Sequence, residues 1–168
     1  MRIVEDLRPQ ALTAEAFAAF GDVVEARANF ELINNGTTRQ FADLAKIDVD
    51  ADGGRPHVSI YRTTPYELPL TIRMLERHPH SSQLFMPLSG EPFLVVVAPA
   101  GADPDVSSAR AFVTDGRQGV NYRRGTWHHP MIALGDPSEF LVIDRAGRGK
   151  NCDEFIFRDE EIVLRRPA

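Results

Sequence analysis

The hydrophobic and polar positions of this chain alternate over short stretches and rarely at helical spacing. Runs rich in Val, Ile, Phe and Tyr are separated by Gly, Pro, Asn and Asp, which is typical of short strands joined by turns. The expected strands are Phe30–Ile33, Val58–Arg62, Ile72–His78, Gln83–Met86, Phe93–Ala98, Arg110–Thr114, Thr126–Met131 and Phe140–Asp144. Many short strands in succession predict a mainly β sandwich or barrel.

One short helix is expected near the N-terminus. Thr13 precedes the stretch AEAFAAF, and Gly21 follows it. Thr13 is a suitable N-cap, Leu12 and Phe17 can pack across the first turn, and Gly21 is a suitable end.

Length, composition and charge describe a globular chain. It has 168 residues, of which 43% are hydrophobic and 26% charged, so we expect residues 1–168 to form one domain. The net charge of -5 leaves no basic surplus to neutralise phosphates, which argues against a nucleic-acid partner. A small anionic substrate remains compatible, because it needs only one or two local arginines.

Cysteine content and the length of the apolar runs indicate the cellular compartment. The lone Cys152 cannot form an internal disulfide, which fits a reducing cytosol. The first ten residues carry acidic side chains and no long apolar core, unlike a signal peptide. The longest apolar run, from Phe93 to Ala100, is too short to span a bilayer. We therefore expect a soluble, cytoplasmic protein with no membrane partner.

Two stretches carry candidate metal ligands. The first, from Glu76 to Gly90, reads ERHPHSSQLFMPLSG and contains the pattern E-x-H-x4-Q-x6-G; the second begins at Gly125 and contains G-x2-H. This resembles the two-part ligand spacing of cupin barrels, with Glu76 in place of the first His and Gln83 in place of the usual Glu. Oxygen and imidazole donors that converge inside a small barrel can hold a divalent cation.

The spacing selects Glu76, His78, Gln83 and His128 as metal ligands. Glu76 and His78 are two residues apart, so on a strand they project from the same face. Gln83 is a neutral, weaker donor, and a hydrogen bond to substrate stays open as its alternative role. His80 lies outside the site by the same count.

The sequence Trp127-His128-His129-Pro130 offers two adjacent histidines. Successive side chains on a strand point to opposite faces, so only one of them can face the barrel interior. The G-x2-H spacing selects His128 and leaves His129 at the rim or beside the ligands. Trp127 is a candidate substrate contact, with core or subunit packing as the competing interpretation.

Several longer segments resemble the ureidoglycolate lyase family, also called ureidoglycolate hydrolases. They are LPLTIRMLERHPHSSQLFMPLSGEPFLVVVAP, RAFVTDGRQGVNYRRGTWHHPMIAL and FLVIDRAGRGKNCDE, and the earlier FGDVVEARANFELINNGTTRQFADLA is similar to the same family. The resemblance extends from Phe17 to Glu154. It implies a cupin-like double-stranded β-helix, or jelly-roll barrel, with a short N-terminal helix.

By this resemblance the chain is expected to be a carbon–nitrogen lyase. It would eliminate urea from (S)-ureidoglycolate and leave glyoxylate, late in allantoin and purine breakdown. The resemblance also implies a divalent metal ion such as nickel, and a homodimer. Three alternatives stay open: a ureidoglycolate hydrolase that releases ammonia, another cupin enzyme for a small acid, and a cupin that binds glyoxylate without turnover.

An anionic substrate needs a cation for its carboxylate, and Arg meets a carboxylate bidentately. Arg62, at the end of a predicted strand, is the first candidate. Asn34, which begins the turn signature NNGT, is a further candidate for a substrate or dimer contact. Asp144, after an apolar run, is a candidate partner for a ligand histidine.

Elimination of urea needs three events: loss of the hydroxyl proton, polarisation of the emerging carbonyl and protonation of the leaving urea. We expect Glu76, His78 and His128 to hold an ion that stabilises the developing charge. The base and the acid stay unassigned, with His129 and a water on the metal as candidates.

Overall fold

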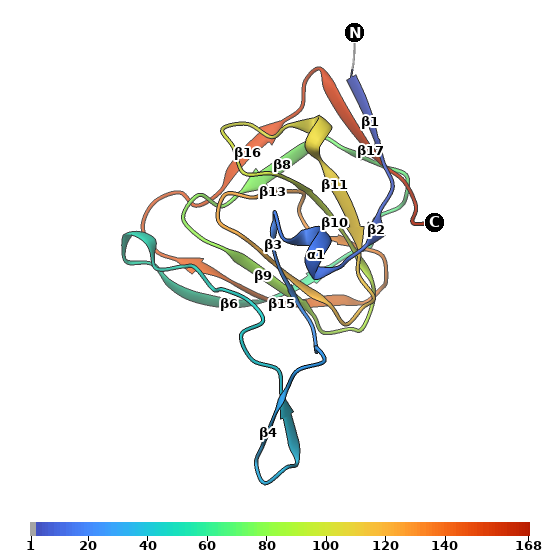
Figure 1. The fold of residues 1–168 in the computed structure, drawn as a ribbon. Coiled ribbons are helices and arrows are strands. Elements are labelled where there is room, and N and C mark those ends of the chain that lie inside the picture. Colours follow the sequence, from blue (N-terminus) through green and yellow to red (C-terminus); the bar gives the residue numbers. More distant parts are fainter. Residues whose placement is uncertain (1–2) are drawn as a thin grey trace.

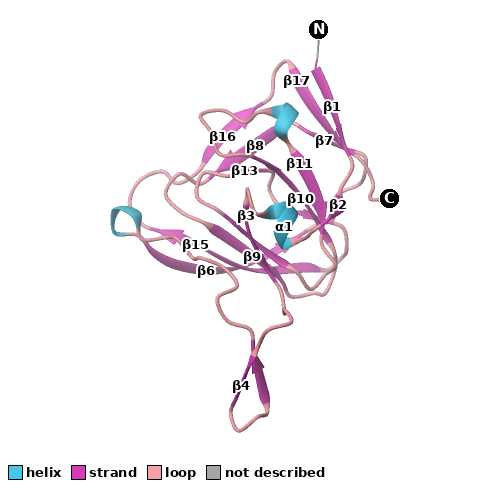
Figure 2. Ribbon diagram, in the orientation of Figure 1, coloured by secondary structure: helices cyan, strands magenta, loops and turns pink. Residues whose placement is uncertain are grey.

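The chain folds almost entirely into β-structure. A computed structural model describes residues 3–168. It contains one α-helix, α1 (Ala14–Phe17), and two 3-10 turns, Ala51–Gly53 and Val106–Ser108; the other elements are strands (Figures 1 and 2). Within residues 3–168, no helix is long and apolar enough to cross a membrane.

The first large sheet has the longest apolar run of the sequence near its centre. In spatial order its strands are β16 (Asp153–Ile156), β8 (Met74–Arg77), β13 (Trp127–His128), β10 (Phe93–Ala98), β11 (Arg110–Val113) and β2 (Gln10–Ala11), and β14 (Ile132–Ala133) also pairs with β10. Neighbouring strands are antiparallel, except that β2 runs parallel to β11.

The second large sheet is antiparallel and faces the first across a shared core (Figure 1). Its strands in spatial order are β3 (Gly21–Val24), β12 (Gly119–Tyr122), β9 (Gln83–Pro87), β15 (Ser138–Ala146) and β6 (Arg55–Thr63). Phe93 and Val95 from the first sheet pack with Phe85, Phe140 and Val142 from the second. The inward side chains of the two sheets therefore form the barrel interior.

Strand β10 is buried on both of its faces. Phe93, Val95 and Val97 face the barrel interior, whereas Leu94 and Val96 belong to a second core. That second core lies against a small sheet of β1 (Ile3–Leu7), β17 (Glu160–Leu164) and β7 (Leu70–Ile72). A strand covered on both sides needs apolar residues at every position, which explains the unbroken run.

Helix α1 begins as the sequence predicts and ends earlier. The Thr13 side chain accepts a hydrogen bond from the Ala16 amide, so the predicted cap is confirmed. The helix stops at Phe17, and Gly21 instead begins β3. The chain turns after Phe17 so that both Phe17 and Phe20 reach the core, where each packs against the ring of Phe112.

A hairpin of β4 (Glu31–Ile33) and β5 (Thr38–Gln40) projects from the body at the bottom of Figure 1. It joins β3 to the segment that leads into β6. Asn34, which the sequence suggests as a substrate or dimer contact, lies in the turn between its two strands.

The predicted fold class, a mainly β cupin-like barrel with a short N-terminal helix, is confirmed. The expected strand over 93–98 coincides with β10, and the one over 58–62 lies within the longer β6. The expected strand over 72–78 is divided between β7 and β8 at Arg73. Strand β1 was not predicted, because it completes its pairing only with a distant segment, β17.

Phe93 provides a test of the shared core. Its fully buried ring packs edge-to-face on Phe140 at 5.1 Å between centroids. Replacing it by Ala should lower the free energy of unfolding by about 3–5 kcal/mol, because it removes buried area and leaves a cavity. Urea unfolding followed by circular dichroism measures this change.

Ile156→Ala is the matched control, because that side chain is 65% exposed. It should change the free energy of unfolding by less than about 0.5 kcal/mol. Equal effects of the two substitutions would contradict the described core.

Candidate active site

The candidate metal ligands come from neighbouring strands. Glu76 lies on β8 and His128 on β13, directly opposite each other in the antiparallel register. His78 follows β8 on the same face as Glu76, and Gln83 begins β9 in the opposing sheet. Strand alternation and pairing therefore bring together residues that lie far apart in the sequence.

The ligand atoms converge on one small region. The Oε1 atom of Glu76 lies 3.5 Å from Nε2 of His128 and 4.0 Å from Nε2 of His78. One ligand atom from each of these three residues lies within 4.8 Å of the others. Gln83 Oε1 lies 3.0 Å from His78 Nε2. We call Glu76, His78 and His128 the Glu/His cluster, with Gln83 beside it.

Backbone carbonyls set the orientation of both imidazole rings. Nδ1 of His78 donates to the Asn151 carbonyl at 2.6 Å, and Nδ1 of His128 donates to the Thr126 carbonyl at 2.9 Å. A carbonyl can only accept, so each Nδ1 carries a proton. This leaves each Nε2 as the atom that can offer a lone pair to a metal ion.

Two features of the cluster fit a cation. His128 Nε2 is buried and has no hydrogen-bond partner within residues 3–168, which is costly unless another group satisfies this atom. The lone pair of His78 Nε2 faces the amide oxygen of Gln83, so two acceptors oppose each other. A carboxylate, two imidazoles and an amide oxygen are suitable donors for a divalent transition ion.

The protonation states also suit metal binding, which requires deprotonated ligands. Burial lowers the pKa of His78, and the nearby His128 lowers it further. Burial raises the pKa of Glu76, but the nearby imidazoles of His128 and then His78 outweigh this effect and leave the pKa below its ordinary value. These pKa directions favour the anionic form of Glu76 and the neutral form of His78.

The cluster opens into a cavity of about 410 Å³ between the two large sheets. Glu76, His78 and Gln83 form one wall, and side chains of β6 and β15 form another. The remaining lining residues are Tyr61, Thr63, Tyr66, Phe85, Pro130, Met131 and Asp144. Among the described residues that line this cavity, none is Arg or Lys.

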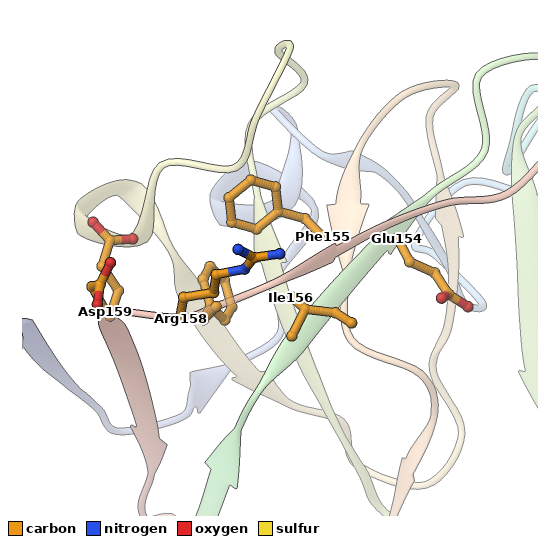
Figure 3. A pocket seen from close by; sticks show the side chains of 7 residues that line it. Glu154, Phe155, Ile156, Arg158 and Asp159 are labelled. Atoms are coloured by element: carbon orange, nitrogen blue, oxygen red, sulfur yellow. The ribbon is translucent and has the colours of Figure 1, made fainter.

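A larger hollow lies along the connection from β16 to β17 (Figure 3). All of its lining residues belong to the single stretch 154–160. The cavity at the Glu/His cluster instead combines residues from several strands of both sheets, so we take that cavity as the candidate active site.

His129 and Trp127 do not line the cavity. Nδ1 of His129 donates to the Pro130 carbonyl at 2.8 Å, and the His129 ring packs edge-to-face on Tyr66. Burial lowers the pKa of His129. Trp127 points to the opposite side of β13 from His128, into the second core, and its Nε1 donates to the Gly101 carbonyl. Trp127 therefore packs in the core, as the competing interpretation predicts, and does not contact the cavity.

Arg62 and Asn34 are also placed away from the cavity. The Arg62 side chain is 80% exposed and pairs with Glu139 at 2.6 Å. It points outward because its neighbours on β6, Tyr61 and Thr63, face the cavity. Asn34 lies in the exposed hairpin turn, and its side chain donates to Thr38. Neither side chain contacts the Glu/His cluster within its own chain.

Several residues of the site were not singled out from the sequence. Tyr61 and Thr63 could have been found from strand alternation, once Arg62 is assigned to the outer face. Asn151 and Thr126 act through their main-chain carbonyls, which no residue type reveals. Cys152 Sγ lies 3.7 Å from Glu76 Oε2, so the lone cysteine lies beside the cluster.

Comparisons with known proteins identify the relatives of this chain. A family model described as "Ureidoglycolate lyase" matches residues 4–164. A protein of Azotobacter vinelandii named "Ureidoglycolate lyase" is 52% identical over 160 residues, which cover 94% of this chain and 96% of the relative. A Pseudomonas aeruginosa protein of the same name is 51% identical over 162 residues, 96% of each chain.

Among solved structures, RmlC from Streptococcus suis in complex with dTDP-D-xylose is similar. It is 16% identical, with a TM-score of 0.47, and the match covers 84% of this chain and 74% of the RmlC chain.

The Glu/His cluster generates a binding prediction. The protein, stripped of metal and titrated with nickel chloride in a calorimeter, should bind one ion per chain. His78→Ala and His128→Ala should each weaken binding at least about a hundredfold. Removal of a residue that only hydrogen-bonds to a metal ligand already lowers metal affinity about 10- to 100-fold, and removal of the ligand itself should cost more.

His80→Ala is the matched control, since His80 pairs with Asp52 at 3.3 Å outside the cluster. It should bind the ion as the unmodified protein does. If His80→Ala abolishes binding while folded and His78→Ala does not, the cluster is assigned to the wrong histidine.

Proposed function

Because the chain belongs to the ureidoglycolate lyase family, we propose that the Glu/His cluster and its cavity release urea from ureidoglycolate and leave glyoxylate. The protein is thus an enzyme of the carbon–nitrogen lyase class, acting in allantoin and purine breakdown. The (S) configuration of the substrate is part of this proposal and comes from the family resemblance.

The observation that carries the proposal is the charge of the cavity. Ureidoglycolate is an anion, and the cavity walls hold the carboxylates of Glu76 and Asp144 but, among the described lining residues, no Arg or Lys. A carboxylate without a positive partner would be costly to bury here. A cation on the Glu/His cluster would supply that partner.

Glu76, His78 and His128 would hold this divalent ion, which we propose to be nickel. Gln83 would serve as a further ligand or would hydrogen-bond the carbamoyl group. When bound, such an ion lowers the pKa of a coordinated hydroxyl and stabilises negative charge on the developing carbonyl. The support for this assignment is the buried, unpartnered Nε2 of His128.

The other cavity residues would orient the substrate. Burial raises the pKa of Tyr61, and the nearby Asp144 and Glu76 raise it further, so its phenol keeps its proton and can donate to a substrate oxygen. Phe85, Pro130 and Met131 form an apolar wall. Such a wall would reduce the access of water to the bound substrate, which would favour elimination over hydrolysis of the ureido group.

We also propose that the protein is a homodimer. Val58 and Ile60 on the outer face of β6 are 63% and 57% exposed, although both are apolar. They pair with Ile143 and Leu141 of β15, so the four side chains form one apolar surface, the outer β6 face. Such surfaces mark interfaces, and β6 also has an unpaired edge.

The projecting hairpin supports the same arrangement. Leu32 on β4 is 61% exposed, and an isolated two-stranded hairpin is only marginally stable in water. A two-fold dimer would cover these surfaces on both copies at once. Asn34 keeps its proposed substrate role only if the hairpin of one copy lies over the cavity of the other.

Two expectations from composition stay predictions: that residues 1–168 form one domain, and that the protein is cytoplasmic.

Product analysis tests the reaction. Protein loaded with nickel and incubated with ureidoglycolate should release urea and glyoxylate in equal amounts, measured by chromatography. Release of ammonia in place of urea would favour a ureidoglycolate hydrolase. Protein stripped with a chelator is the control and should lose most of its activity, because the anionic substrate then lacks its positive partner.

Sedimentation tests the dimer. The double variant Val58→Asp and Ile60→Asp should sediment as a monomer at micromolar concentration, because it buries two charges in the outer β6 face. Ile156→Asp, on the equally exposed Ile156 of β16, should remain dimeric. A double variant that sediments as the unmodified dimer would place the interface elsewhere.

A further inference from the structure

Asp144 is a cavity carboxylate that the proposed metal site leaves unused. It lies on β15, where Phe140, Val142 and Asp144 alternate onto the inner face, and it lines the cavity together with Glu76, His78 and Gln83. Among the described residues, the metal-binding groups of this region include Glu76 but not Asp144. The carboxylate of Asp144 is therefore available for a role other than metal binding.

His57 accompanies Asp144 on the neighbouring strand. The two residues are directly opposite in the β15–β6 register, and His57 Nδ1 lies 3.1 Å from Asp144 Oδ1. The Asp144 side chain is 20% exposed, whereas that of His57 is 52% exposed. The pair thus connects the cavity to the solvent across the β6 rim.

The other titratable groups near the cavity are less suited to accept a proton. Glu76 and His78 face each other and His128 in the Glu/His cluster. Tyr61 retains its proton because burial and the neighbouring carboxylates raise its pKa. His129 donates from Nδ1 to the Pro130 carbonyl and does not line the cavity.

Asp144 has acceptor capacity to spare. A carboxylate offers about four lone-pair positions on its two oxygens, and the hydrogen bond to His57 involves only Oδ1. The second oxygen, Oδ2, can therefore accept a proton from a substrate in the cavity.

Resting on the proposed function, we propose that Asp144 is the catalytic residue that moves the substrate proton, with His57 as its positioning residue. Asp144 accepts the proton of the substrate hydroxyl, and the oxygen electron pair forms the carbonyl of glyoxylate. The carbon–nitrogen bond breaks, and its electron pair stays on the urea nitrogen. That nitrogen then takes the proton back from Asp144.

These reaction steps balance without any co-reactant. One proton leaves oxygen and arrives on nitrogen, and the carboxylate returns to its starting form. A single residue can serve as base and then as acid because the two substrate atoms are bonded to the same carbon. His57 holds the carboxylate toward the cavity through its hydrogen bond and exchanges protons with solvent.

Asp144→Ala and Asp144→Asn test the catalytic role in metal-loaded protein whose unmodified form releases urea and glyoxylate. Both variants should lower kcat at least about a hundredfold, the usual contribution of a positioned acid–base group. Both should keep one nickel ion per chain by elemental analysis. Added formate should raise kcat of Asp144→Ala at least tenfold, because a small carboxylate fits the vacated space, but should not rescue Asp144→Asn.

Glu139→Gln is the matched control. Glu139 lies on the same strand but on the outer face, paired with Arg62, and its loss should leave kcat within a factor of two. Loss of nickel from Asp144→Asn would make Asp144 a ligand and overturn the inference. A kcat of Asp144→Ala or Asp144→Asn within tenfold of that of the unmodified enzyme would also overturn the inference. Neither result affects the proposed function, which fails only if the unmodified protein does not form the two products.

A double-mutant cycle tests His57. His57→Ala should lower kcat about tenfold with KM unchanged, and His57→Gln, which retains a donor, should recover part of the loss. In the Asp144→Ala background, His57→Ala should have no further effect, since it acts through the missing carboxylate. Additive losses would assign His57 a separate role and remove it from the proposal.

Discussion

Strand β10 is buried on both faces, and its packing determines where the active-site residues lie. Its side chains alternate between the barrel interior and the core beneath the small sheet. In the pairing with β13, Val97 lies opposite His128 and Ala98 opposite Trp127. A slip by one residue would exchange the two faces of a strand. The register that buries β10 therefore also directs His128 toward Glu76 in the Glu/His cluster and Trp127 into the second core.

The Glu/His cluster is a polar group of atoms placed inside this apolar frame. Main-chain carbonyls of Thr126 and Asn151 take the Nδ1 protons of the two imidazoles, so both Nε2 lone pairs point to the same region. Among the described residues, the buried His128 Nε2 has no hydrogen-bond partner. Burying an unpaired polar atom lowers stability, and a bound cation would offset that loss.

The two sheets contribute different chemistry to one cavity. Strands β8 and β13 of the first sheet hold the Glu/His cluster, which suits the binding of a cation and, through it, of an anionic substrate. Strands β15 and β6 of the second sheet carry Asp144 and His57, which suit the movement of a proton. The reacting carbon would lie between the two walls, within reach of both.

The sequence by itself determined the fold class and most of the Glu/His cluster, because both depend on local spacing, and its resemblance over most of the chain indicated the family. Strand periodicity places Glu76 and His78 on one face, and the G-x2-H spacing distinguishes His128 from His129. An apolar run such as Phe93–Ala98 predicts a strand without knowledge of its neighbours. Only the tertiary structure decided the roles that depend on pairing between distant strands. It turned Arg62 outward and Trp127 into the core, and it placed Asp144 beside His57 at a separation of 87 residues. It also revealed the carbonyls that orient the imidazoles, because main-chain groups are the same in every residue and only the fold directs them.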